Sequence, residues 1–411
     1  SGAHPLPIRV ANGRVDTRAD VRVDTRADVR ADVRADARAA GDAGRGRSPG
    51  SSHRTSDPYC RRMRAAVMQN WELRVDDIDV PTPGHGQVLT RVLSCGICGS
   101  DLHMLRHGEE SRRLADELAA DDPEAGTGMN MFDPSGATVM GHEFCCEVVE
   151  LGPGVEHLAP GDVVVSMPAA FDTQGVHPLG FSNAYPGGYA EHMVLNEMLS
   201  TKVPTGLPHR MAALTEPLAV GVHAVAKSGA AVGDAALVVG LGPVGLACIA
   251  ALKMLGIGPI VGSDFSPARR RLAEHLGCDE VVDPANERPI AAWRRIDGSK
   301  PLVVFEAVGV PGMIDQTMRM APVGSRILVV GACMQEDRMY PMVGIGKELS
   351  LQFVLGYQPD EFTAALDAIA TERVDLAPLL TGVVDIDGIP GAFTELGNPD
   401  AHAKILVEPR N

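Results

Sequence analysis

Short apolar runs alternate with helix-like segments over the second half of the chain. Residues 246–256 have the apolar pattern of a helix. Four runs have the length and apolar content of buried strands: residues 236–239, 260–263, 302–305 and 326–330. Strands that alternate with helices predict an α/β protein with a doubly wound parallel sheet.

The stretch at residues 235–252 has 18 residues without a charge, which is long enough for a membrane-spanning helix. Gly240, Gly242, Pro243 and Gly245 interrupt it, however, and no other part of the sequence has a comparable run. We therefore interpret it as a buried strand, a turn and a buried helix. We expect a soluble, cytoplasmic protein that does not bind membranes.

Charged residues dominate the first 62 residues, where Arg recurs at every fourth position from Arg14 to Arg38 with an Asp midway between neighbours. In a helix this spacing places like charges one turn apart, and in a strand all charges share one face. Neither form buries enough apolar surface to offset the entropy of ordering. We expect residues 1–62 to be a disordered or low-complexity tail that is dispensable, with the globular pattern opening at Met63. The alternative is a partner-binding arm.

The charge of the remaining chain narrows the choice of partners. The net charge of −16 includes 13 Arg and 8 Asp from residues 1–62, which leaves 24 basic against 45 acidic residues, a net charge of −21. Such a surface repels phosphate backbones and anionic lipids. We therefore exclude nucleic acid and membrane as partners and expect a small neutral substrate.

A glycine fingerprint follows the strand predicted at residues 236–239. It reads Gly240-Leu241-Gly242-Pro243-Val244-Gly245 and lies between a strand and a helix, the context that binds dinucleotides. The first glycine permits the turn, the second admits a pyrophosphate, and the third lets helix and strand pack closely. The candidate cofactor-binding residues here are Gly240, Gly242, Pro243, Val244 and Gly245. The alternative is a Rossmann-like domain that binds no nucleotide.

Asp264 follows the second predicted strand, 22 residues after the second glycine of the fingerprint. A carboxylate there accepts hydrogen bonds from the ribose 2′-OH and repels a 2′-phosphate, so NAD is favoured over NADP. Arg269 and the two arginines after it either weaken this preference or form the solvated first turn of the next helix. Val330, Gly331 and Ala332, after the last strand, are expected to form a backbone ledge for the nicotinamide carboxamide.

Two segments far apart in the sequence hold side chains typical of a zinc site. The first contains Cys95 and Cys98, and the second contains His142 and Glu143, which taken alone would also fit a surface pair. A catalytic zinc takes three protein ligands and keeps a fourth position open. There is no second CxxC to close a structural site, since Cys145-Cys146 are adjacent and point to opposite faces of a strand. One of the first two cysteines is expected to bind the metal and the other to pack, and spacing alone does not decide which.

Five segments in a fixed order carry a family resemblance. They are G-I-C-G-S-D-L-H at 96–103, G-H-E-F at 141–144, G-D-V-V at 161–164, E-P-L-A-V-G-V-H at 216–223, and the glycine fingerprint. From Met63 onward the chain resembles the medium-chain zinc dehydrogenase superfamily, nearest its polyol, butanediol and threonine dehydrogenase branches. The resemblance implies a GroES-like β-barrel catalytic domain at residues 63–210, completed by 356–411, and a Rossmann NAD-binding domain at 211–355. It also implies a homodimer or homotetramer.

The resemblance assigns the metal ligands. The family's zinc thiolate is the Cys directly before Gly-Ser-Asp, which corresponds to Cys98 and leaves Cys95 as a packing residue. The imidazole ligand corresponds to His142. Glu143 is a ligand in some members and a nearby acid in others, while Glu216 stands where polyol-type members have a third ligand. We therefore expect one catalytic Zn²⁺ per chain, with the two carboxylates able to exchange as ligands.

The resemblance also implies hydride transfer between a small secondary alcohol, diol or polyol and NAD. In such enzymes Zn²⁺ acts as a Lewis acid on the alcohol oxygen. Ser100 corresponds to the hydroxyl that receives the substrate proton. His103 corresponds to the residue that passes it to solvent, which suits an imidazole near neutral pH; a purely structural His103 is the alternative. The candidate catalytic residues are Ser100, His103 and Glu143.

Two features depart from the family. Many members hold a second, structural zinc with four closely spaced cysteines after G-D-V-V, but residues 161–191 contain no cysteine, so we expect no structural zinc. In addition, His142 follows Cys98 by 44 positions, and the extra residues 107–139 contain an acidic helical stretch at 111–122. This insertion either covers the substrate cleft and sets specificity or lies on the surface.

Two other functions compete with this interpretation. One is a metal-free, NADPH-dependent enone or quinone reductase of the same superfamily, which lacks the Cys, His and Glu set. Cys98, His142 and Glu216 argue against it. The other is a non-catalytic binding protein that retains the fold, against which the relay residues Ser100 and His103 argue.

Overall fold

The computed structural model describes residues 61–122 and 132–409. The tail predicted at residues 1–62 therefore lies outside the described residues, except for its last two. Strand β1 already begins at Arg62, so the strands start one residue before the boundary predicted at Met63. Residues 123–131 of the predicted insertion also lie outside the described residues.

The described chain contains helices and strands throughout. The strands are β1 (Arg62–Gln69), β2 (Glu72–Asp79), β3 (Gln87–Gly96), β4 (Thr138–Val139), β5 (Glu143–Leu151), β6 (Val163–Ser166), β7 (Ala169–Asp172), β8 (Gly175–Pro178), β9 (His192–Asn196), β10 (Ser200–Lys202), β11 (Ala235–Val239), β12 (Ile260–Ser263), β13 (Glu280–Val282), β14 (Leu302–Glu306), β15 (Arg326–Val329), β16 (Ser350–Phe353), β17 (Leu380–Val384) and β18 (Lys404–Val407). The helices are α1 (Gly99–Asp121), α2 (His209–Ala212), α3 (Thr215–Ser228), α4 (Pro243–Met254), α5 (Pro267–His275), α6 (Pro289–Asp297), α7 (Met313–Met320), α8 (Pro341–Lys347), α9 (Pro359–Ala370) and α10 (Ile389–Glu395).

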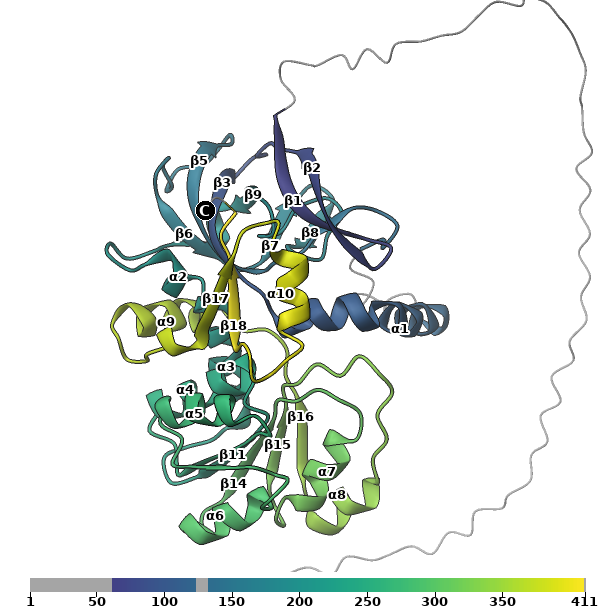
Figure 1. The fold of residues 1–411 in the computed structure, drawn as a ribbon, viewed down its shortest axis with the longest axis vertical. Coiled ribbons are helices and arrows are strands. Elements are labelled where there is room, and N and C mark those ends of the chain that lie inside the picture. Colours follow the sequence, from purple (N-terminus) through teal and green to yellow (C-terminus); the bar gives the residue numbers. More distant parts are fainter. Residues whose placement is uncertain (1–60, 123–131, 410–411) are drawn as a thin grey trace, which may run out of the picture. The chain divides into compact units, whose positions relative to one another are not determined.

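The strands before residue 203 form sheets that the end of the chain completes. A three-stranded sheet has the order β2-β1-β4, and a seven-stranded sheet has the order β10-β6-β5-β3-β18-β17, with β9 also paired to β3. β18 runs antiparallel to β3 and parallel to β17, which places the C-terminal strands, yellow in Figure 1, beside the N-terminal ones. Apolar side chains such as Met63, Val92 and Phe144 form the core of this part.

A second, parallel sheet follows in the chain, with the order β13-β12-β11-β14-β15-β16. The four strands predicted from apolar runs are β11, β12, β14 and β15, each within one residue of its predicted ends. Along β11, Ala236 and Val238 face one core while Leu237 and Val239 face another, so both faces of the strand are buried. Strands covered on both faces are what a doubly wound sheet requires. The α/β fold class is confirmed.

The turn between β11 and α4 shows why two glycines of the fingerprint are needed. Gly240 has a φ of +92°, which disfavours other residues. A Cβ at Gly245 would lie 1.9 Å from the carbonyl oxygen of Gly240, so only glycine lets the helix pack this closely. α4 begins at Pro243, where a missing N–H costs nothing. The uncharged stretch is therefore a strand, a turn and a helix, as predicted.

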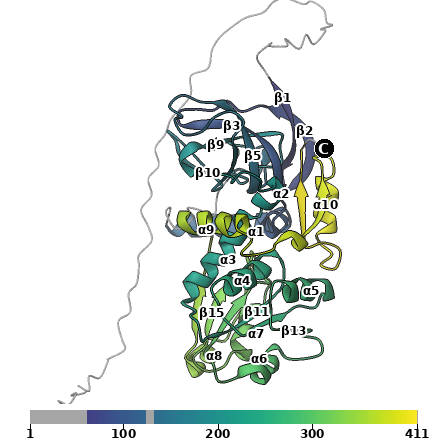
Figure 2. The same ribbon diagram turned by 90° about the vertical axis from the view of Figure 1, so that its left-hand side faces the viewer.

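Helix α3 links the two parts of the chain and packs against α9. Figure 2 shows α9 next to α3, where Nδ1 of His223 lies 2.7 Å from Oε2 of Glu361. Both side chains are mostly buried, so this contact holds α9 against α3. Within the described residues, no helix is both long enough and apolar enough to cross a lipid bilayer.

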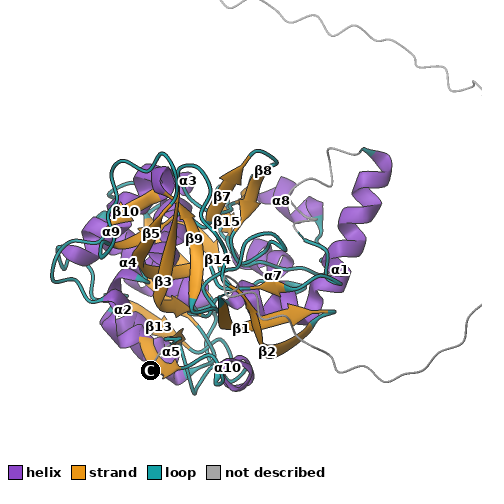
Figure 3. Cartoon of the chain, turned by 90° about the horizontal axis from the view of Figure 1, so that it is seen from above, coloured by secondary structure: helices purple, strands orange, loops and turns teal. Residues whose placement is uncertain are grey.

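Helix α1 is longer than the sequence pattern predicted. A helix was expected at residues 111–122, whereas α1 begins at Gly99, directly after Cys98. Trp71 packs on α1 at Gly108, where a Cβ would lie 2.1 Å from the indole ring. The ring of Phe132, at the return of the insertion, meets the same indole edge-on with centroids 5.9 Å apart. Both ends of the insertion therefore rest on the β1–β2 turn, and the rest of α1 extends away from the strands (Figure 1, Figure 3).

Candidate functional site

Strand pairing brings the two predicted metal-binding segments together. β3 and β5 run antiparallel, with Gly96 opposite Glu143. Cys98 follows the end of β3, and His142 directly precedes β5. Since residues opposite each other in an antiparallel pair are neighbours in space, this register places Cys98 beside His142 despite their separation in sequence.

Cys98, His142 and Glu143 form the one group of three or more metal-binding side chains found in residues 61–122 and 132–409. One ligand atom from each lies within 4.8 Å of the others. His142 and Glu143 are buried, and Cys98 is half-buried. A thiolate, an imidazole and a carboxylate at this spacing suit Zn²⁺. The structure thus brings together three of the four predicted ligands.

Glu216, the fourth predicted ligand, lies outside that group but near it. It stands in the first turn of α3 and is only 9% exposed. Burial raises the pKa of its carboxyl to about 7; the positive charges of His142 and Lys404 oppose this rise, and the negative charge of Glu143 adds to it. The hydroxyl of Tyr357 is also buried, and burial together with the charge of Glu216 raises its pKa.

Lys404 neutralises Glu143. Its Nζ lies 2.7 and 2.6 Å from the two carboxylate oxygens and donates a third hydrogen bond to the carbonyl of Ile97 at 3.1 Å. Both charged side chains are 1% exposed. Burial opposes the charge of Lys404, but the negative charges of Glu143, Cys98 and Glu216, with the hydrogen bonds to Glu143, together raise the pKa of the ammonium. A Cβ at Gly96 would lie 2.0 Å from Oε2 of Glu143, so glycine is required there to make room for the carboxylate.

Asp101 orients His142. Its Oδ1 lies 3.4 Å from Nδ1 of His142, and its Oδ2 accepts hydrogen bonds from the Cys98 amide at 3.1 Å and from the Tyr189 hydroxyl at 2.5 Å. Burial opposes protonation of the ring, but the charges of Asp101 and Cys98 raise the pKa of His142 well above its usual value. A carboxylate beside one ring nitrogen holds a metal-binding imidazole in a fixed orientation and tautomer.

Cys95 is a packing residue in this structure. It is fully buried, its Sγ lies 3.6 Å from the carbonyl oxygen of Gly96, and the backbone of Gly141 and Gly188 approaches the sulfur closely. Burial raises the pKa of its thiol well above the usual value. Cys145 and Cys146, which were predicted to point to opposite faces of a strand, belong to different cores on the two sides of β5.

The residues present fit a divalent cation. The carboxyl groups of Asp101, Glu143 and Glu216 are buried in this part of the structure, and the only buried basic side chains around them in the described residues are Lys404 and His142. Buried charge of one sign is costly unless it is compensated. Nδ1 of His142 and Oδ1 of Asp101 are buried and lie 3.4 Å apart, and neither atom has a hydrogen bond. A bound cation that neutralises the acids and fixes the imidazole removes this imbalance.

Ser100 and His103 lie in the first two turns of α1. Both side chains are partly exposed. The pKa of His103 is lowered, first by burial and then by the positive charges of His107 and Arg106, although a hydrogen bond that the ring donates to the backbone of Ala332 opposes this. His103 therefore contacts a residue that is predicted to border the nicotinamide.

The predicted nucleotide residues have defined partners. Asp264 follows β12, where its Oδ2 accepts from the Leu241 amide at 2.8 Å and its Oδ1 accepts from the Ser266 amide at 2.8 Å. Nη1 of Arg269 lies 3.7 Å from the same carboxylate. The backbone after β15 is held by the carbonyl of Glu306, which accepts from the amides of Val330 and Gly331 at 2.8 and 2.9 Å. Leu241 belongs to the glycine fingerprint, so Asp264 and the fingerprint adjoin.

Three residues of the site were missed by sequence reasoning: Asp101, Tyr357 and Lys404. Asp101 carried a signal, because an acid within the Cys98–His103 segment is placed to reach a neighbouring ligand. Lys404 and Tyr357 carried none, since they lie more than 200 positions after His142.

Comparison with known proteins agrees with this geometry. The model of the alcohol dehydrogenase GroES-like domain matches residues 84–205, and that of the zinc-binding dehydrogenase matches residues 243–371. The (R,R)-butanediol dehydrogenase of Bacillus subtilis (strain 168) is 33% identical over 358 residues, which is 84% of this chain and 100% of the relative. The sorbitol dehydrogenase of Bos taurus is 30% identical over 352 residues, 82% of this chain and 93% of the relative.

A solved structure shares the fold. It is described as a zinc-binding dehydrogenase from Sinorhizobium meliloti 1021 bound to NADP, with a TM-score of 0.71, 26% identity, and coverage of 85% of this chain and 100% of that one. The two family models and these relatives together cover most of the chain and nearly the whole length of each relative. The chain belongs to the zinc-dependent medium-chain dehydrogenase superfamily and is an oxidoreductase of its alcohol and polyol dehydrogenase type.

Proposed function

We propose that the protein is a zinc-dependent dehydrogenase that transfers a hydride between a small secondary alcohol, diol or polyol and NAD. The observation that carries this proposal is the convergence of Cys98, His142 and Glu143 within 4.8 Å among buried acid groups. The names of the butanediol and sorbitol dehydrogenase relatives support a substrate with neighbouring hydroxyl groups.

We assign Cys98 and His142 of this cluster as ligands of one zinc ion, and we propose that the third ligand is Glu216 rather than Glu143. Both oxygens of Glu143 are already bound by Lys404, whereas no cation is bonded to Glu216 in the described part of the chain. When bound, Zn²⁺ supplies a Lewis acid that lowers the pKa of an alcohol hydroxyl. Asp101 holds the imidazole of His142 in place, and Glu143 remains beside the site as the acid that Lys404 neutralises.

Ser100 and His103 are the proposed proton path. Ser100 is one turn before His103 on α1, so both project from neighbouring positions of the same helix. The lowered pKa of His103 leaves its ring free to accept a proton at neutral pH. Its hydrogen bond with the Ala332 backbone supports a position beside the cofactor.

NAD is the proposed cofactor, bound at the fingerprint from Gly240 to Gly245 and along the backbone of Val330 to Ala332. The negative charge of Asp264 would repel a 2′-phosphate, and Arg269 is directed at that carboxylate. We propose residues 63–210 with 356–411 as the catalytic domain and 211–355 as the nucleotide domain, which agrees with the pairing of β17 and β18 with β3. A cytoplasmic location stays a prediction.

A metal-free NADPH-dependent reductase is the second candidate. It needs no cluster of thiol, imidazole and carboxylate such as the one that Cys98, His142 and Glu143 form here. A binding protein without activity is disfavoured for the same reason. Burying such a cluster costs free energy, and clusters of this kind are typical of functional sites.

The test is an assay of the purified full chain with metal analysis. We expect about one zinc per chain and NAD-dependent oxidation of a diol such as 2,3-butanediol or a polyol such as sorbitol. The kcat/KM with NADP should be at least about tenfold lower than with NAD, because the 2′-phosphate of NADP and the carboxylate of Asp264 repel each other. A chelator should remove activity, and added Zn²⁺ should restore it. Full activity without zinc, or a preference for NADPH and enones, would replace this proposal by the second candidate.

The oligomeric state is proposed from the edge of the parallel sheet. β16 is the last strand, with Phe353 65% exposed and Leu355 beyond it 94% exposed. An open strand edge with apolar side chains pairs readily with its own copy about a two-fold axis. We expect a homodimer in analytical ultracentrifugation, and Phe353→Lys with Leu355→Lys should shift it to monomer. A monomeric wild type at micromolar concentration would contradict this.

A further inference from the structure

The segment after β6 is held without cysteine ligands. Residues 161–191 contain no cysteine, whereas the chain's resemblance is to proteins that often hold a zinc in this region. Here β7 and β8 form an antiparallel hairpin, and residues 179–188, called the site loop below, follow it. In this chain, hydrogen bonds from polar side chains hold the hairpin and the site loop in place.

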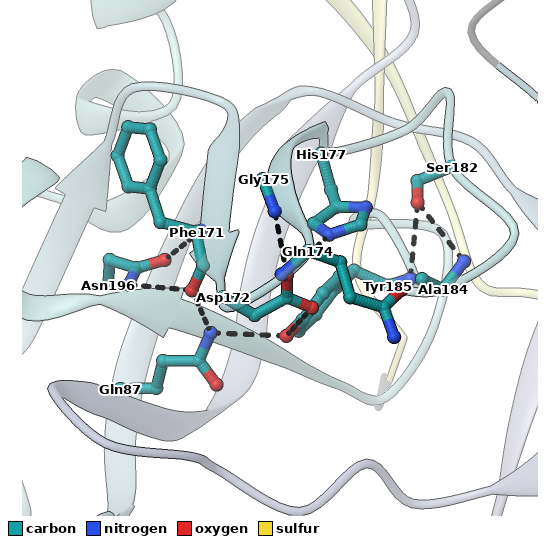
Figure 4. Close-up of polar contacts among 10 residues, drawn as sticks. All are labelled: Gln87, Phe171, Asp172, Gln174, Gly175, His177, Ser182, Ala184, Tyr185 and Asn196. Atoms are coloured by element: carbon teal, nitrogen blue, oxygen red, sulfur yellow. Dashed lines mark hydrogen bonds and ion pairs between the residues drawn. The ribbon is translucent and has the colours of Figure 1, made fainter.

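The root of the hairpin is held by two side chains of the main sheet. Gln87 of β3 lies opposite Asn196 of β9. Nε2 of Gln87 donates to the carbonyl of Phe171 at 2.9 Å, and the amide of Phe171 donates to Oδ1 of Asn196 at 2.8 Å. Both side chains are buried, so the backbone of β7 is fixed to the sheet through one residue, as Figure 4 shows.

Asp172 closes the tip of the hairpin and binds Tyr185 in the second half of the site loop. Its Oδ1 accepts hydrogen bonds from the amide of Gln174 at 2.7 Å and from Nε2 of His177 at 2.9 Å. Its Oδ2 accepts from the Tyr185 hydroxyl at 3.2 Å, and the Tyr185 and His177 rings lie 5.1 Å apart (Figure 4). Asp172, His177 and Tyr185 are called the Asp172 clasp below.

The site loop reaches the candidate metal ligand. The ring of Phe181 lies 5.4 Å from the ring of His142, tilted by 36°. Gly180, with a φ of +88°, lies against Gly141, where a Cβ would come within 3.2 Å of the backbone. The amide of Gly188 donates to the carbonyl of Gly141 at 2.8 Å. The loop therefore contacts the backbone directly before His142 and covers one side of its ring.

Asn183 ties the return of the insertion to the same loop. Its Oδ1 accepts from the amide of Asp133 at 2.7 Å, and its Nδ2 donates to the Asp133 carbonyl at 3.0 Å and to Oγ1 of Thr138 at 2.9 Å. Thr138 begins β4, four residues before His142. The site loop is thus held by contacts with the hairpin, with the return of the insertion and with the segment that contains His142.

We propose that Asp172 is a positioning residue of the active site. Through the Asp172 clasp it holds the site loop so that Phe181 forms an apolar wall beside His142, with no second metal. For its effect on substrate, this inference rests on the proposed function. Because Asp172 touches neither the candidate ligands nor the fingerprint, its loss acts on substrate placement rather than on the metal.

The test compares the wild type with Asp172→Ala and Tyr185→Phe in the full-length, zinc-loaded chain. Asp172→Ala is expected to raise KM for a diol about fivefold with kcat changed by less than about twofold, the size of effect expected for one or two hydrogen bonds. Tyr185→Phe removes the hydroxyl that donates to Asp172 and accepts from Nε2 of Gln87 at 3.3 Å, and it should raise KM in the same direction while leaving the bonds of Asp172 to the hairpin intact. Hydrogen–deuterium exchange should become faster in residues 179–188, with zinc content unchanged.

The matched control is Asp297→Ala. Asp297 closes an exposed turn at the end of α6 by accepting hydrogen bonds from the amide and hydroxyl of Ser299. The control variant therefore also lacks an aspartate that closes a turn, but the turn lies in the parallel-sheet part of the chain. It should leave KM and loop exchange unchanged. The proposal is overturned if hydrogen exchange in residues 179–188 is unaltered in Asp172→Ala. It is also overturned if the variant has a lower kcat and a lower melting temperature, which would indicate general unfolding. A wild type that oxidises no alcohol would refute the proposed function, while loop exchange would still decide the role of Asp172.

Discussion

Cys98→Ser is expected to lose the bound zinc and to lower kcat/KM for alcohol oxidation by at least about a thousandfold. The substitution replaces a thiolate by a hydroxyl that stays protonated and binds zinc weakly. A thousandfold loss corresponds to about 4 kcal/mol of transition-state stabilisation, within the several kcal/mol that a Lewis acid supplies. NAD binding should be retained, because the fingerprint and Asp264 belong to a different sheet. Elemental analysis, steady-state kinetics and calorimetry with NAD measure the three quantities.

Cys95→Ser is the matched control, since it makes the same atomic change three residues earlier. Cys95 packs against Gly141 and Gly188 and is fully buried, so the variant should keep its zinc and most of its turnover, with some loss of stability. The opposite result, zinc retained in Cys98→Ser and lost in Cys95→Ser, would show that the other thiol of the CxxC is the ligand.

Lys404→Met is expected to lower the free energy of unfolding by about 3 kcal/mol, because it leaves a buried carboxylate without its partner. Lys404 and Glu143 are each 1% exposed, and all three ammonium hydrogens are used, two on Glu143 and one on the Ile97 carbonyl. Methionine keeps most of the side-chain volume, so the effect reports on charge rather than on a cavity. The shift of the urea unfolding midpoint, recorded for the zinc-free chain, measures it.

Two comparison variants isolate the buried pair. Lys202→Met breaks an exposed ion pair with Asp162 at 2.8 Å and should cost no more than about 1 kcal/mol. Glu143→Gln combined with Lys404→Met removes both charges and should recover much of the stability lost by Lys404→Met alone. Equal losses for Lys404→Met and Lys202→Met would mean that the buried pair does not hold the structure as described.

The parallel sheet was predictable because its signals are local. Its four inner strands are short runs dominated by apolar residues, and Gly240 and Gly245 mark the turn that follows β11. The two edge strands, β13 and β16, were not predicted, because β13 has only three residues and β16 is largely exposed and contains Ser350 and Gln352. Strands covered on both faces by helices need no information about distant partners to be recognised. Helix α1 was bounded wrongly for the opposite reason. Its first turns contain Ser100, Asp101 and His103, which carry the chemistry of the site and interrupt the apolar pattern that marks a helix.

The insertion shows the same limit. Its acidic residues predicted a helix at 111–122, but only the fold shows that Trp71 on the β1–β2 turn packs against Gly108 and Phe132. These contacts fix where the insertion leaves and returns, and Asn183 links its return to the site loop. No spacing in the sequence relates Trp71 to Gly108, since their contact depends on a turn that brings a strand pair against a helix.

The sequence by itself determined the α/β class, the dinucleotide turn and the residue types at the metal site, because each depends on a short segment and on the chemistry of its side chains. The family resemblance already implied Cys98 rather than Cys95, and Cys98 lies beside His142 in the structure. Only the tertiary structure decided that Lys404 neutralises Glu143 and that Asp101 lies beside the imidazole. These choices follow from the register of β3 against β5 and from the return of β18 beside β3. Register between distant strands sets which side chains share a buried space, and burial sets what their charges require.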